Sequence, residues 1–383
     1  MALENKLGLA MEQTAFAVLE TTKGTIAFPT VAGEMLVGAG QGEVNQQPTF
    51  TDSEEIVNSL DILQRFQDMT PAGTWSFPLY LRPSGVAGTA PMGDVLYQSL
   101  MGVKTVNAST SVVYSQSTTK PSFTYWIKKS HVVFFATGAT CATTAWNTTN
   151  KGAPMLNFSG GFMRMGWAGM SEIQGAVTAS TDITVEAGLG GLFTAGARVK
   201  IGTDDNSNAG YEIDSVSGDV VTLTEAVTAS DLDVIEGFLP VFTPLGTALE
   251  SRASVVSFDA TPAVIKSLDV TIGTPVQYLE NELTTDGYPV DYVPGRRDVS
   301  GTLNINFRRE DVKYFETART GTQRVATLVT VGTVAGDIAK LSLPTTQLEV
   351  PSTSTDGDIL SMSMGIKGLG SGTGENSATI TFQ

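Results

Sequence analysis

The chain has 383 residues, of which only 16% are charged, and its formal net charge is −16. That length allows two or three domains, each with its own core, and the acidic balance argues against a protein that clamps nucleic acid by neutralising phosphates. The single cysteine, Cys141, excludes an intrachain disulfide, and no apolar run approaches the roughly 20 residues of a membrane helix.

Glycine (40 residues), threonine, serine and valine dominate the composition, which is typical of a mainly β protein with many turns and little helix. The first residues lack the apolar core of a signal peptide, so we expect synthesis in a cytoplasm. Residues 1–48 are predicted to form an arm followed by strands. Residues 50–72 then favour either a short helix or an extended hairpin. The further elements expected in this half are strands at 74–81, 122–128, 131–137 and 155–164 and a short helix at 93–101.

Residues 176–237 differ from the rest in charge, because they hold 11 acidic and two basic side chains. Alternating stretches at 182–185, 197–201 and 211–216 predict strands. A Ser217-Gly218-Asp219 turn leads into a further strand at 220–223, as in a hairpin. We therefore expect a small acidic β-domain, inserted between residues 1–175 and residues 238–383.

The second half repeats the element order of the first. The alternating stretch that begins at Gly73 recurs 228 residues later at Gly301, and each is followed by a short helix. The expected helix of the second half covers residues 310–318. A long loop at 278–298 occupies the place that residues 50–72 hold in the first half. Strands are expected at 254–258, 267–272, 299–307, 325–331, 338–343, 346–350, 358–367 and 376–382.

This element order resembles the tail tube proteins of long-tailed bacteriophages. The resemblance is carried by the loop 278–298, the strand that ends at Phe307, the helix opened by Asp311-Val312-Lys313-Tyr314 and the strands on either side of Pro344. It implies a β-sandwich or barrel unit with a short helix, and here that unit is duplicated. It also implies a structural virion subunit, assembled in the host cytoplasm, whose stacked rings form a tube for DNA. Because the unit is doubled, three chains could fill the six positions of a ring, and a hexamer is the alternative.

The resemblance further implies which partners and residues take part in assembly. The partners are other copies of the chain, the tape measure protein, the tail terminator and distal tail proteins, and phage DNA that passes without specific binding. Contacts between subunits or rings are expected from two loops. The first contributes Glu54, Glu55, Ile56, Leu60, Leu63 and Phe66, and the second contributes Tyr278, Leu279, Glu280, Tyr288, Tyr292, Arg296 and Arg297.

An enzyme is not expected from these residues, and neither is a cofactor or a metal. His131 is the only histidine, which excludes a Ser-His-Asp triad and a paired-histidine zinc site. Cys141 stands among threonines and alanines, and we expect it in an inert loop. Two alternatives to the tube subunit remain open: a capsid decoration or other virion surface protein, and an extracellular carbohydrate-binding or carbohydrate-active β protein.

Overall fold

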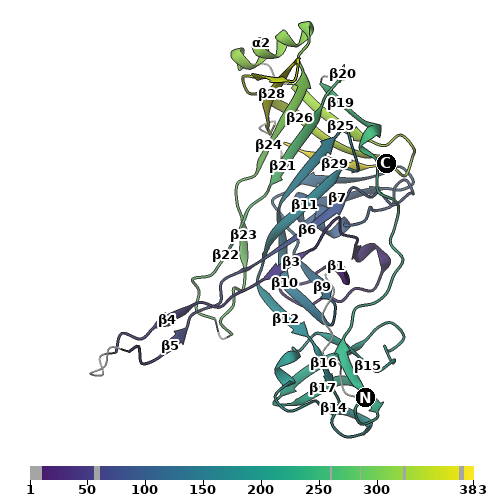
Figure 1. Ribbon diagram of the computed structural model, residues 1–383, viewed down its shortest axis with the longest axis vertical. Coiled ribbons are helices and arrows are strands. Elements are labelled where there is room, and N and C mark those ends of the chain that lie inside the picture. The colour runs from purple at the N-terminus through teal and green to yellow at the C-terminus, as the bar shows by residue number, and fades with distance from the viewer. Residues whose placement is uncertain (1–10, 56–60, 259–260, 285, 322–324, 371–374) are drawn as a thin grey trace.

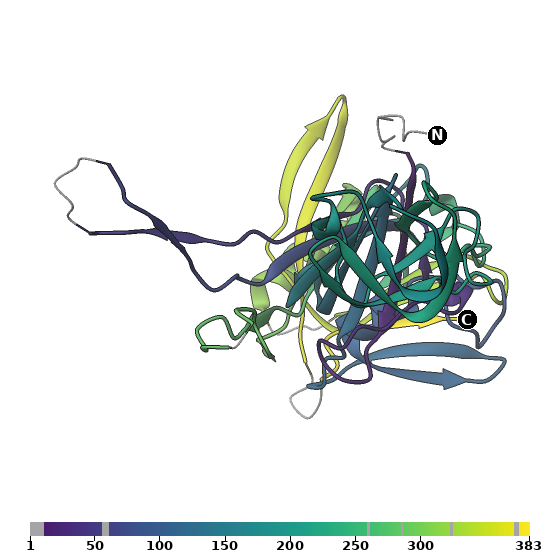
Figure 2. The ribbon, with the colours of Figure 1, turned by 90° about the horizontal axis from the view of Figure 1, so that it is seen from below.

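The fold is described from a computed structural model that covers residues 11–383, apart from 56–60, 259–260, 285, 322–324 and 371–374. The molecule is elongated and mainly β, as the composition predicts (Figure 1). Helix α2 (Val312–Thr320) lies at one end and a small sheet at the other, and a long hairpin projects from the side. Figure 2 shows the same hairpin extending away from the body in a second view.

Antiparallel pairing organises the first half. Its strands are β1 (Gln13–Leu19), β2 (Met35–Leu36), β3 (Glu43–Asn45), β6 (Gly73–Tyr80), β9 (Phe123–Lys129), β10 (Val132–Thr149) and β11 (Met155–Phe162). Strand β1 pairs with β2 and β9, β9 with β10, β10 with β11, β11 with β6, and β6 with β3. Helix α1 (Asp94–Met101) follows β6 and buries most of its residues against the core.

The second half repeats this network pair by pair. Its strands are β19 (Ser254–Phe258), β20 (Thr261–Ala263), β21 (Ser267–Gly273), β24 (Asp298–Asn306), β25 (Val325–Val331), β26 (Ala339–Leu348), β27 (Ser352–Asp356) and β28 (Ile359–Gly368). Strand β19 pairs with β20 and β25, β25 with β26, β26 with β28, β28 with β24, and β24 with β21. The repetition predicted from the sequence is therefore present in the strand pairing.

The two networks also agree in register. Thr74 lies opposite Gly161 in the pairing of β6 with β11, and Thr302 lies opposite Gly365 in the pairing of β24 with β28. Gly73 and Gly301 precede these threonines, as the repeat predicts. The exact limits of the units (1–175, 176–237 and 238–383) stay predictions.

The halves are joined in the central sheet, where residues 143–149 of β10 pair with Ser267–Gly273 of β21. Their inward side chains enter a shared core, where each large side chain contributes about 1.5–3 kcal/mol when fully buried. That core includes Trp75, Phe77, Trp146, Phe158, Leu268 and Met364. The last strand, β29 (Thr379–Phe382), also bridges the halves, because it pairs with β26 and with β8 (Ser111–Gln116).

A six-stranded sheet forms the end opposite α2. Its strand order is β13 (Met170–Glu172), β18 (Val234–Gly237), β15 (Arg198–Ile201), β16 (Tyr211–Ser217), β17 (Val220–Ala229) and β14 (Val177–Thr184). The hairpin expected at Ser217-Gly218-Asp219 joins β16 to β17, with Gly218 at φ +58°. The core of this sheet continues into the first unit through Phe16 and Trp126.

Several elements differ from the sequence-based expectations. Strand β10 runs for 18 residues instead of ending near residue 137, because register shifts let it leave β9 and continue along β11. Cys141 consequently lies in a strand and not in a loop, and His131 lies in the turn before it. The hairpin of β7 (Gly102–Asn107) with β8 was not predicted. Strand β26 is continuous through Pro344, which a register shift accommodates, where two strands were expected.

Candidate assembly surfaces

The central sheet presents a polar face made of small side chains. Its six strands lie in the order β6, β11, β10, β21, β24 and β28, with every neighbouring pair antiparallel. Because side chains alternate along a strand, the face opposite the core carries every second residue. We call it the polar face, and its middle is formed by Ser76, Asn157, Ser159, Thr143, Ala145, Asn147, Thr271, Ser300, Thr302, Asn304 and Ser363.

Charge is scarce on the polar face. Across these six strands its charged side chains are Asp269, Asp298 and Lys367, and the last two form an ion pair. Asp269 lies opposite Thr302 and Asn147, and partial burial raises the pKa of its carboxyl. Short neutral side chains with an isolated carboxylate provide no cluster of cations, so this face is not suited to hold phosphates.

Two hairpin arms extend from the central sheet at matching positions. The first arm, residues 49–68, lies between β3 and β6 and contains β4 (Phe50–Asp52) paired with β5 (Arg65–Gln67). The second arm, residues 274–295, lies between β21 and β24 and contains β22 (Val276–Tyr278) paired with β23 (Tyr292–Pro294). Of the two structures expected for residues 50–72, the hairpin is therefore the one formed.

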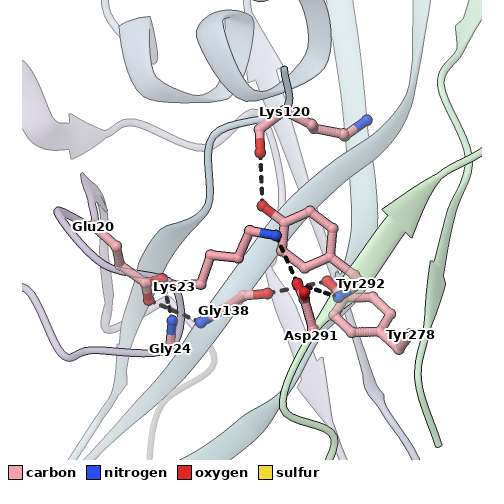
Figure 3. Close-up of polar contacts among 8 residues, drawn as sticks. All are labelled: Glu20, Lys23, Gly24, Lys120, Gly138, Tyr278, Asp291 and Tyr292. Atoms are coloured by element: carbon pink, nitrogen blue, oxygen red, sulfur yellow. Dashed lines mark hydrogen bonds and ion pairs between the residues drawn. The ribbon is translucent and has the colours of Figure 1, made fainter. Parts of the chain in front are cut away.

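The second arm is anchored on the first unit of its own chain through two tyrosines (Figure 3). The Tyr278 hydroxyl lies 2.9 Å from Thr140 Oγ1 and donates to the Gly138 carbonyl at 3.1 Å. The Tyr292 hydroxyl donates to the Lys120 carbonyl at 2.6 Å. Both tyrosines are buried, with exposed fractions of 9% and 3%, so they contribute apolar area as well as hydrogen bonds.

Charged side chains make further contacts around the two tyrosines. Lys23 forms an ion pair with Asp291 at 2.6 Å, and its ammonium lies 4.4 Å from the Tyr292 ring centroid. Glu20 accepts hydrogen bonds from the backbone N–H groups of Gly24 and Gly138, both at 2.8 Å. Burial raises the pKa of the Glu20 carboxyl, although these hydrogen bonds oppose the shift.

Lys120 binds the first residue of the second arm, Thr274. Its ammonium donates to the carbonyl of Thr274 at 2.6 Å and also contacts the Thr274 hydroxyl. Burial lowers the pKa of Lys120 to about 8, because the charged form loses hydration. None of Glu20, Lys23, Lys120, Gly138 and Thr140 was singled out from the sequence, since each stands in an ordinary Ser/Thr/Gly-rich context.

Other residues expected at subunit contacts also lie along the second arm. The backbone N–H of Leu279 donates to the backbone carbonyl of Asp291, and the Glu280 carboxylate accepts from the backbone N–H of Ala72 at 2.8 Å. Arg164 lies 5.1 Å from the ring centroid of Tyr288. All these contacts are within the chain, and a role between subunits stays a prediction for these residues.

Among the described residues, no part of the chain covers the first arm in a comparable way. Its apolar side chains are exposed, with fractions of 46% for Phe50, 55% for Leu63 and 50% for Phe66. Glu54 and Glu55 are exposed on the same hairpin. Ile56 and Leu60 lie outside the described residues. An exposed apolar hairpin of this kind is typical of a surface that binds another protein.

Arg296 and Arg297 lie at the base of the second arm, beside a surface pocket of about 660 Å³. Arg297 forms a 2.7 Å ion pair with Glu375, and Arg296 is exposed. The pocket is also lined by Asp298, Lys367 and Gly368, at the end of the polar face. The two arginines are therefore neighbours with different surroundings, since Arg297 is paired and Arg296 faces solvent.

The described residues give no indication of a reaction site. Among them no three His, Cys, Asp or Glu side chains gather as metal ligands. Cys141 is completely buried, and burial raises the pKa of its thiol to about 12, which makes it an inert core residue. Within the same residues, no helix has the length and apolar character needed to cross a membrane.

A mainly β chain with a doubled strand network, a polar sheet face and an exposed arm defines a structural subunit that assembles with others. The phage tail tube protein family matches residues 6–383, nearly the whole chain, and the chain belongs to that family. Among curated proteins, none matches it. Membership makes the chain a structural component of a phage tail, located in the virion, that assembles into a tube with other tail components. The resemblance seen in the sequence is thereby confirmed.

Proposed function

We propose that three copies of the chain close a ring of six units and that these rings stack into the tail tube. The repeated strand network carries this proposal, because each half of the chain provides one complete unit with its own arm. The pairing of β10 with β21 supports it further, because it joins the two halves of the chain into one continuous sheet. Repeating that joint around a closed symmetry pairs the edge strands of each chain, which would otherwise be open to aggregation.

The polar face is proposed to line the channel through which phage DNA passes. Continuing the central sheet around the ring creates an inner wall of serine, threonine, asparagine and glycine. Such a wall neither attracts phosphates strongly nor offers apolar area to bases, so DNA can move along it without sticking. The acidic six-stranded sheet would then decorate the outside of the tube, where its charge keeps the surface solvated.

The remaining partners are proposed from the position of a tube within a tail. The tape measure protein would occupy the channel before DNA does, and the tail terminator and distal tail proteins would cap the two ends. Assembly would take place in the cytoplasm of the host.

Electron microscopy of the purified protein and infection assays together test this function. Rings or tubes with a central hole of DNA width are expected as concentration rises. A preparation in which every oligomer is non-tubular would contradict the proposal. Phage carrying Thr271→Lys and Thr302→Lys should assemble normal tails but eject DNA more slowly, because both exposed side chains lie on the polar face. Thr224→Lys, on an exposed position of β17, is the matched control and should eject normally. Wild-type ejection by the double lysine variant would show that another face lines the channel.

A further inference from the structure

The internal joint provides a template for the joint between chains. Within the chain, Thr143 lies opposite Gly273, Ala145 opposite Thr271, and Asn147 opposite Asp269. This joint uses one edge from each unit: the second half of β10 from the first unit, and β21 from the second. Each unit also has a second edge that this joint does not use. In the first unit it is the counterpart of β21, and in the second unit it is the counterpart of the second half of β10.

Strand β27 is the counterpart of the second half of β10. Thr143 lies opposite Ser159 of β11, and Ser352 lies opposite Ser363 of β28. Ser159 and Ser363 are equivalent, since each stands two residues before the glycine that faces a threonine across the pair, Gly161 or Gly365. Position 352 in the second unit therefore corresponds to position 143 in the first.

Strand β3 is the counterpart of β21. Asp269 lies opposite Thr302, and Asn45 lies opposite Thr74, which is the equivalent threonine of the first unit. In the described part of the chain, β27 pairs only with β28 and β3 only with β6. All five residues of β27 are exposed. The central sheet of one chain therefore has two open edges, β27 and β3. Their counterparts, the second half of β10 and β21, already pair with each other inside the chain.

We propose that β27 of one chain pairs with residues 43–49 of a second copy, antiparallel and in the register of the internal joint. Ser352 then lies opposite Thr49, Ser354 opposite Gln47, and Asp356 opposite Asn45. The inference rests on the proposed ring and adds its contact residues and register. A shift of one residue would turn the small polar side chains away from the channel, so the register is strongly constrained.

The joint between chains is more polar than the internal one. The core-facing residues of β10 and β21 include Trp146 and Ile272, whereas their counterparts are Thr355 and Pro48. Pro48 also lacks an N–H group and makes one backbone hydrogen bond fewer. This joint is therefore expected to be weaker than the internal one, and it calls for an additional contact.

The first arm provides that contact. When the alignment of β3 with β21 is continued into the arms, Asp52 corresponds to Val276 and Glu54 corresponds to Tyr278. On the second unit, Gly365 and Lys367 replace Gly161 and Met163, which lie under Tyr278 in the first unit. The Glu54 carboxylate of one chain therefore comes near the Lys367 ammonium of the next, which already pairs with Asp298 of its own chain, and near the Glu349 carboxylate that lies over Gly365. An apolar contact inside the chain becomes a charged one between chains.

Disulfide trapping tests the register. Rings of the Gln47→Cys/Ser354→Cys variant, verified by electron microscopy before oxidation, should give covalent dimers and closed trimers on a denaturing gel. Gln47 and Ser354 are both accessible at open edges, and Cys141 is fully buried and does not compete. Ala145→Cys/Thr271→Cys is the positive control, because these opposed residues should form a disulfide within one chain. Thr49→Cys/Ser354→Cys is displaced by two residues on the same face and should not cross-link.

The outcomes separate this inference from the proposed function. If rings form and the positive control cross-links, but Gln47→Cys/Ser354→Cys does not, the register is wrong while the tube assignment stands. If the wild-type protein forms no rings, the proposed ring fails and the joint fails with it, while membership of the tail tube family stands. Charge reversal gives an independent reading in an Asp298→Asn background, which removes the partner of Lys367 within its own chain. There, Glu54→Lys and Lys367→Glu should each weaken assembly several-fold, and the two changes together should restore it. Additive losses in the double variant would overturn the arm contact.

Discussion

Tyr278 lies directly over Gly161, so closely that a β-carbon added to this glycine would come within 2.6 Å of the tyrosine ring. The contact joins the second arm to the sheet of the first unit, and it depends on the missing side chain. The same place on the second unit is held by Gly365, where the Glu349 side chain lies instead of an arm. The two units therefore differ at this place: the first is covered by the aromatic ring of an arm, and the second by a carboxylate side chain.

Gly161→Ala should loosen the second arm. The added methyl group must displace the Tyr278 ring or the sheet, and overpacking of this kind costs about 1–3 kcal/mol. Urea unfolding should report the loss, and limited proteolysis should show faster cleavage near Leu283, which is 98% exposed at the tip of the arm. Gly191→Ala is the matched control, because its new methyl group meets no atom within 4 Å. Equal stabilities of the two variants would contradict the packing described here.

Tyr278→Phe isolates the hydrogen bonds of the same side chain. The Thr140 hydroxyl and the Gly138 carbonyl both lose a partner in a buried environment, which costs about 1–3 kcal/mol. Tyr80→Phe, at a hydroxyl whose residue is 39% exposed, should change the free energy of unfolding little. Unfolding of both phenylalanine variants at the same urea concentration would contradict the hydrogen bonds described for Tyr278.

Lys120 should make stability depend on pH in the alkaline range. Its pKa falls from 10.5 to about 8 on folding. Below pH 8 the ammonium is charged in both states, so the full cost of burying it is present. Between pH 8 and 10.5 the folded chain releases the proton before the unfolded chain does, and stability rises. The wild-type protein should gain at most about 3 kcal/mol relative to Lys120→Met across this range. A constant or falling difference between the two unfolding free energies would show that Lys120 is not held as described.

Leu63→Asp/Phe66→Asp should separate assembly from folding. Both side chains are at least half exposed, so the free energy of unfolding of the single chain should change by no more than about 0.5 kcal/mol. Assembly should be lost, because two charges replace the apolar surface offered to the neighbouring subunit. Val241→Asp, at an 81% exposed position outside the arms, should assemble normally. Sedimentation at increasing concentration measures the difference, and tubes formed by the double variant would exclude the first arm from the interface.

The strands with clear alternation could be predicted from the sequence, and those without it could not. Trp75, Phe77 and Leu79 alternate with smaller residues, so β6 and its repeat at 298–306 were predictable. The second half of β10 consists of threonine, alanine and asparagine around Trp146, a pattern that does not distinguish a strand from a loop. The most informative joint of the molecule was therefore missed.

The arms illustrate a second limit. Their sequence positions could be matched, but both sets of residues were assigned to contacts between subunits. Only the structure distinguishes Tyr278 and Tyr292, which are buried on their own chain, from Leu63 and Phe66, which remain exposed. Tertiary pairing across more than a hundred residues decides this, and local periodicity carries no information about it.

The mass of the closed ring distinguishes a ring of three chains from a ring of six. Native mass spectrometry or light scattering of isolated rings should give three chains of 40.3 kDa, because each chain provides two of the six units. A ring of six chains would contradict the account, since the two halves of the chain would then not occupy equivalent positions around the channel.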